Sequence, residues 1–188
     1  MPVTINKEKI QCWISDIGRP ELAFLGVLTA GHLVVHWYNN LLSLVLPLIK
    51  TWLSLSDVQV GPIVAVQMGA SSGLVLITGL MADSFRRRGA LIVSGSILCF
   101  GLAYLIIGVS SNYGWVLVGV SMIGLGSALW HPAAMGAISI RFSERRGMAL
   151  SIHGVGASVG DVIGPIIVGA IIMIVDWKFT LVMHLFPA

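Results

Sequence analysis

The sequence predicts an all-α membrane protein, a six-helix bundle with five complete membrane spans followed by a truncated sixth. Hydrophobic residues make up 56% of the 188 residues and charged residues only 10%, which is typical of a chain embedded in lipid. The charges are gathered between apolar runs that are each long enough to cross a bilayer core, for which about 20 helical residues suffice. We divide the chain into a polar N-terminal segment, residues 1–21, and a transmembrane bundle, residues 22–188.

The first three spans follow directly from the apolar runs. Span one is expected over residues 22–49, an apolar run that begins after Pro20 and Glu21. Span two covers residues 58–82 and carries glycines at the four-residue spacing that lets helices approach closely. Span three covers residues 90–109.

The remaining spans are separated by short turns and a charged loop. Residues 115–140 form span four, which we expect Pro132 to interrupt, because proline lacks the backbone donor of a regular helix turn. Residues 148–175 form span five. A sixth span starts after Lys178, and we expect the chain to end within it.

The basic residues predict the orientation in the membrane. The N-terminal segment and the two loops after spans two and four together hold nine basic residues: Lys7, Lys9, Arg19, Arg86, Arg87, Arg88, Arg141, Arg145 and Arg146. The opposite side has only Lys50 and Lys178. Because basic loops stay in the cytoplasm, we expect a multi-pass protein of the cell (plasma or inner) membrane with a cytoplasmic N-terminus. The polar start of the chain does not have the form of a cleavable signal peptide.

Span one carries a polar face. His32, His36, Asn39, Asn40 and Ser43 recur at offsets that place them on one side of a helix. Polar groups are unfavourable in hydrocarbon, so this face should either line a solute or proton pathway or form hydrogen bonds with other helices. Histidines one turn apart can also bind a metal, but no third ligand is evident from the spacing, so we expect neither a metal nor a cofactor.

Two further polar residues lie inside spans. His131 stands beside Pro132 in span four, and Asp161 is a carboxylate within span five. An ionised carboxylate there must be paired or reach a water-filled cavity, or else be protonated. Asp161 is therefore a candidate for coupling or substrate binding, with a purely structural hydrogen bond as the alternative.

Span five also contains a glycine stripe. Gly156, Gly160 and Gly164 repeat every four residues and are followed by Pro165, a pattern that lets another helix pack closely. Residues 156–160 also match the G-x-S-x-G pattern of hydrolases, but that pattern needs a strand, a sharp turn and a helix, so we do not expect an enzyme.

The loop after span two resembles the signature loop of major facilitator transporters. The residues that match its pattern are Gly79, Ala82, Asp83, Arg87 and Arg88. The stretch from Gly124 to Pro132 is similar to that of the fosmidomycin-resistance type of facilitator, and the segment from Gly160 to Gly169 is similar to the antiporter motif of this superfamily. The resemblance covers residues 22–188.

This resemblance implies the N-terminal half of a secondary transporter that works by alternating access between two six-helix bundles. It also implies that the helices packed against the glycine stripe of span five come largely from the second bundle. The complete form would carry out proton-linked transport or efflux of a small organic solute. Its cavity would contain His32, His36, Asn39, His131 and Asp161, and its cytoplasmic gate Gly79, Asp83, Arg87 and Arg88.

The rival interpretation is a truncated, non-transporting membrane fragment, or a chain that donates helices to another half-length chain. The expected partners are the lipid bilayer, a small-molecule substrate, and either a missing C-terminal half, a second copy or another half-length chain. No nucleic acid is expected.

Overall fold

The computed structural model describes residues 17–186, and the described chain contains helices and turns but no strand. Five long helices are followed by a short one. Their bounds are α2 Arg19–Trp52, α3 Asp57–Ser84, α4 Gly89–Val109, α5 Tyr113–Arg141, α6 Arg146–Ile174 and α7 Trp177–Met183. The arginine-containing turns Arg86–Arg88 and Ser143–Arg145 are single 3₁₀ turns. All five long helices are long and apolar enough to span a membrane, which agrees with the five complete spans expected.

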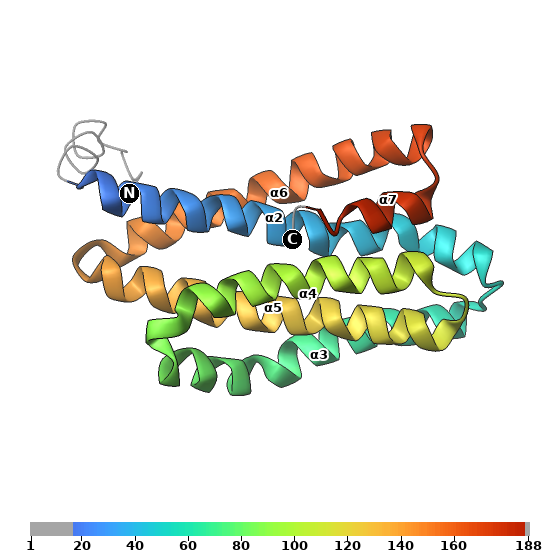
Figure 1. Ribbon diagram of the computed structural model, residues 1–188, viewed down its shortest axis with the longest axis horizontal. Coiled ribbons are helices and arrows are strands. Elements are labelled where there is room, and N and C mark those ends of the chain that lie inside the picture. Colours follow the sequence, from blue (N-terminus) through green and yellow to red (C-terminus); the bar gives the residue numbers. More distant parts are fainter. Residues whose placement is uncertain (1–16, 187–188) are drawn as a thin grey trace, which may run out of the picture.

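The helices form an elongated bundle in which successive helices run in opposite directions (Figure 1). α2 packs along α6, whereas α5 packs between α3 and α4. The short α7 turns back from the end of α6 and lies against α4. Both arginine-containing turns and the start of α2 lie at one end of the bundle, so the basic residues described there share one side (Figure 1).

α5 is not interrupted at Pro132, contrary to the sequence expectation. The helix is continuous from Tyr113 to Arg141. Proline at this position cannot donate to the carbonyl of Ala128, four residues earlier. That carbonyl instead accepts a 2.7 Å hydrogen bond from Oγ1 of Thr78 on α3. A side chain from a neighbouring helix thus satisfies the backbone group that the proline frees.

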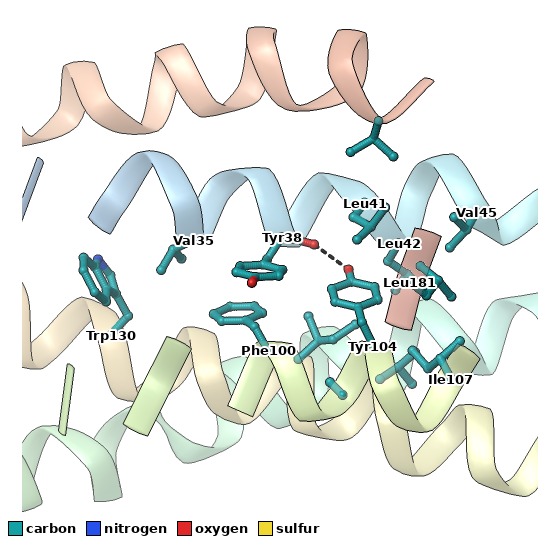
Figure 2. Packing of buried hydrophobic residues seen from close by; sticks show 14 of the residues in the cluster. Val35, Tyr38, Leu41, Leu42, Val45, Phe100, Tyr104, Ile107, Trp130 and Leu181 are labelled. Carbon is teal, nitrogen blue, oxygen red and sulfur yellow. Dashed lines mark hydrogen bonds between the residues drawn. The ribbon is translucent and has the colours of Figure 1, made fainter. Parts of the chain in front are cut away.

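The core lies where α2, α4 and α5 meet. The rings of Tyr38 and Phe100 are stacked, with centroids 5.4 Å apart (Figure 2). The Tyr104 hydroxyl donates to the carbonyl of Tyr38, which Figure 2 marks with a dashed line. The Tyr38 hydroxyl in turn donates to the carbonyl of His184 at 2.6 Å, just after α7. Polar atoms of these buried rings are therefore paired with backbone groups, as burial requires.

The glycine stripe of α6 packs against α2, not against a helix from a second bundle as the family resemblance implied. A Cβ atom at Gly156 would lie 2.1 Å from the carbonyl oxygen of Thr29, and one at Gly160 would lie 2.3 Å from that of Leu33. One turn further, Gly164 faces Trp37. The stripe therefore brings the backbones of α2 and α6 into contact. This close packing sets the distance between the polar side chains of α2 and those of α6 that lie beside the stripe.

Candidate functional site

Four histidines from three helices meet inside the bundle. α2 supplies His32 and His36, α5 supplies His131 and α6 supplies His153. The rings of His32 and His153 are stacked, with centroids 4.1 Å apart. His36 and His131 meet the same His32 ring edge-on, at 4.7 and 5.5 Å. His32 is thus the centre of the group, which we call the histidine cluster.

A carboxylate from α6 adjoins the histidine cluster. Asp161 lies near the middle of α6, and its Oδ1 accepts hydrogen bonds from Nδ1 of His36 at 2.9 Å and from Nδ2 of Asn40 at 2.7 Å. The His36 side chain is 26% exposed and that of Asp161 is 49% exposed. This hydrogen-bonded pair therefore lies on a face of the bundle that is partly open, whereas His32 and His153 behind it are buried.

The hydrogen bonds define which ring nitrogens carry protons. Nδ1 of His32 lies 3.0 Å from the carbonyl oxygen of His153, and Nδ1 of His131 lies 2.8 Å from that of Ser127. A carbonyl oxygen can only accept, so both Nδ1 atoms are donors and the Nε2 atoms carry the lone pairs of the neutral rings. Nε2 of His32 is buried without a hydrogen-bond partner.

Asn39, predicted to share this pathway, faces a different space. It borders a cavity of about 330 Å³ between α2, α3 and α5, whose lining includes Ser43, Gln67, Ser71 and Ser127. Consecutive residues of a helix are about 100° apart, so Asn39 and Asn40 reach different neighbours. The single polar face expected on span one is therefore divided between the histidine cluster and this polar cavity.

The loop residues predicted as a gate lie at the end of the bundle that holds the arginine-containing turns. Oδ1 of Asp83 accepts a 3.2 Å hydrogen bond from Arg86, three residues later, while Arg87 and Arg88 are exposed. Asp83 and Arg86 border a cavity of about 420 Å³ that extends along α5 to Arg141. The arginine paired with Asp83 is thus Arg86, which is not among the residues that match the signature pattern. Gating by Gly79, Asp83, Arg87 and Arg88 stays a prediction.

Ser158 does not have the surroundings of a hydrolase nucleophile. It is an exposed residue within the continuous helix α6, and its hydroxyl lies 3.5 Å from the carbonyl oxygen of Gly154. A nucleophile elbow requires a sharp turn between a strand and a helix.

Two residues of the site were not among the predicted site residues. Asn40 lies one turn after His36, and its spacing alone indicated that both could reach the same partner. His153 carried no such signal, because only the packing of α6 on α2 brings it to His32. The sequence predicted no metal site because no third ligand was evident beside His32 and His36. The fold brings His131 close to these two histidines.

Comparison with known proteins identifies the family. A profile described as Major Facilitator Superfamily matches residues 28–188. The chain is 28% identical over 155 residues to the fosmidomycin resistance protein of Escherichia coli (strain K12), covering 82% of this chain and 37% of that protein. It is 30% identical over 159 residues to the puromycin resistance protein pur8 of Streptomyces alboniger, covering 84% of this chain and 31% of that protein. The chain therefore spans well under half the length of these relatives.

A solved structure shares the fold. The inward-facing, occupied structure of a bacterial homologue of the human lysosomal transporter Spinster aligns with a TM-score of 0.72 and 20% sequence identity. The alignment covers 91% of this chain and 43% of that one. Since the family profile matches most of the chain and the helical bundle agrees with it, this multi-pass membrane protein belongs to the Major Facilitator Superfamily.

Proposed function

We propose that the chain forms one of the two six-helix bundles of a secondary transporter of the cell membrane, which moves a small organic solute by alternating access. The observation that carries this proposal is the Asp161–His36–Asn40 group, polar and partly open near the middle of two membrane-spanning helices. Polar and ionisable residues at that depth are unfavourable unless they serve a pathway or a binding site. The resistance functions named for two relatives support a solute of the drug type and transport in the direction of efflux.

We further propose that transport is linked to protons and that Asp161 is the residue on which the coupling depends. The carboxylate has a histidine and an amide as its direct partners, and its side chain remains half-exposed to the open face. A solute or ion that enters from that face would meet Asp161 before it met the buried rings of His32 and His153.

Exchange of this carboxylate for an amide tests the coupling. In vesicles that contain the protein with its second bundle, Asp161→Asn should abolish uphill, proton-driven transport and leave downhill exchange measurable, because the amide keeps the volume and removes the charge. The matched control is Asp57→Asn, an exposed acidic residue in the first turn of α3. Uphill transport that is unchanged in Asp161→Asn would assign that residue a structural role.

The second candidate is a membrane bundle that pairs with another polypeptide without itself transporting. It is favoured by large exposed apolar side chains on α3 and α6, which include Leu76 (72% exposed) and Ile166 (67% exposed). Either lipid or the helices of another bundle can cover such a face in a membrane. A second copy of this chain, another half-length chain or a C-terminal half would each complete the cavity.

A further inference from the structure

We infer that His32, His36 and His131 form a binding site for a divalent transition-metal ion of the zinc type. One ring nitrogen from each of the three residues lies within 4.8 Å of the other two. Imidazole nitrogens are favoured ligands of zinc, copper and nickel, and three protein ligands with one open position make a familiar zinc arrangement. This inference is independent of the transport proposal, because it concerns equilibrium binding alone.

The outer hydrogen bonds are those of metal-ligating histidines. Such histidines usually donate their second ring N–H to a backbone carbonyl or a carboxylate, which fixes the tautomer and the ring orientation. Here Nδ1 of His32 and Nδ1 of His131 donate to backbone carbonyls, and Nδ1 of His36 donates to Asp161. All three rings are therefore held with Nε2 as the nitrogen available to an ion.

An unpartnered buried nitrogen supports the same conclusion. Nε2 of His32 is enclosed by the protein and accepts no hydrogen bond from it, and both ring nitrogens of the neighbouring His153 are likewise buried without a partner. Buried polar atoms without a partner are rare in folded proteins, and an ion is one of the partners that resolves them. His184 provides the contrast, since its Nδ1 lies 2.6 Å from the carbonyl oxygen of Thr180 and its Nε2 accepts from Trp37 at 3.1 Å.

Coordination of one ion would require the ring nitrogens of the three histidines to move only slightly closer together. With bonds of about 2.05 Å, tetrahedral coordination separates ligand atoms by about 3.4 Å, so ring nitrogens that lie within 4.8 Å of one another must approach by no more than about 1.4 Å. His36 and His131 are only partly buried and can move by side-chain rotation, whereas His32 is held in the core. A bound ion would join α2 to α5 directly, and would reach α6 through the hydrogen bonds to His153 and Asp161.

Cobalt(II) binding to the purified protein tests the inference. The protein is prepared without an affinity tag, with Cys12 and Cys99 replaced by serine to remove thiol ligands, and is titrated with Co²⁺ in detergent micelles. We expect saturable one-to-one binding, with the visible absorption bands of a four-coordinate Co²⁺ site that Zn²⁺ displaces. Binding that does not saturate, or a spectrum of fully hydrated Co²⁺, would overturn the proposal.

Single substitutions locate the ion. His36→Asn and His131→Asn should each weaken Co²⁺ binding by at least about 100-fold. Asp161→Asn should weaken it by about 10-fold, because the amide oxygen can still accept from Nδ1 of His36 but lacks the negative charge that strengthens this outer hydrogen bond. The matched control His184→Gln should bind Co²⁺ as the parent protein does. Circular dichroism and size-exclusion chromatography establish that each variant is folded. Equal affinity in the parent protein, His36→Asn and His131→Asn would show that the ion binds elsewhere.

Discussion

At the scale of single residues, the glycines of α6 divide into two kinds. Gly156 has no room for a side chain, because the backbone of Thr29 on α2 occupies the space where a Cβ would lie. Gly154, two residues earlier on the same helix, has nothing within 4 Å of that position. The two glycines look alike in the sequence, and only the neighbouring helix distinguishes them.

Alanine at these two positions should have opposite effects on stability. Gly156→Ala should lower the free energy of unfolding by about 1–3 kcal/mol, because the added methyl group forces α2 and α6 apart. Gly154→Ala should leave stability unchanged or raise it by up to about 1 kcal/mol, since alanine favours the helix. Thermal unfolding of both variants in detergent, followed by circular dichroism, measures the difference. If Gly156→Ala were as stable as Gly154→Ala, α2 and α6 would not be in backbone contact at this level.

At the scale of elements, the two arginine-containing turns define one end of the bundle. Arg86–Arg88 and Ser143–Arg145 connect α3 to α4 and α5 to α6, and α2 begins at the same end. A further ion pair at that end joins Arg141 on α5 to Glu21 on α2 at 3.1 Å. The fold places these basic groups together, and the cytoplasmic location of that end is a proposal from the excess of positive charge.

Cysteine labelling tests this orientation. In a background without Cys12 and Cys99, single cysteines at Arg87 and Ser111 should react with a membrane-impermeant thiol reagent from opposite sides. The first position lies in the arginine turn after α3 and the second lies between α4 and α5. In intact cells only the cysteine at Ser111 should be labelled, and permeabilised cells provide the control in which both react. Labelling of Arg87→Cys in intact cells would reverse the orientation.

At the scale of the whole molecule, the proposed function makes the bundle one wall of a cavity shared with a second bundle. Asp161 and His36 face a partly open side, and no other described helix covers the exposed apolar residues of α6. Alternating access requires two bundles that move against each other around a shared site. Under the proposed function, the described bundle would supply one half of that site.

The chain by itself should therefore show no saturable solute flux when purified and reconstituted into vesicles. If it pairs with a second copy, a cysteine at Ile166 should form a crosslinked dimer, because this side chain is 67% exposed on α6. A cysteine at Val168, which is buried on the same helix, serves as the control and should not crosslink. Saturable flux from a preparation shown to be monomeric would contradict the two-bundle mechanism.

The apolar runs and the charges between them were enough to predict the helices. Their number, order and approximate ends follow from the sequence, because backbone polar groups in a bilayer core need hydrogen-bond partners. A helix supplies nearly all of these partners within one segment, so a long apolar run is expected to be helical. The signature loop and the glycine patterns likewise indicated the family. None of these features depends on a distant part of the chain.

The candidate site was decided by the tertiary structure. His32, His36, His131 and Asp161 could each be identified as polar residues within spans, but their meeting depends on α6 packing against α2 and on α5 lying beside them. Asn39 lies apart from these residues because it borders the cavity between α2, α3 and α5. His153 joins them because α6 packs against α2 and stacks its ring on that of His32. Local periodicity determines which side of a helix a residue occupies. The helix that faces that side is determined by contacts between residues more than a hundred positions apart, such as the contact of His36 with Asp161.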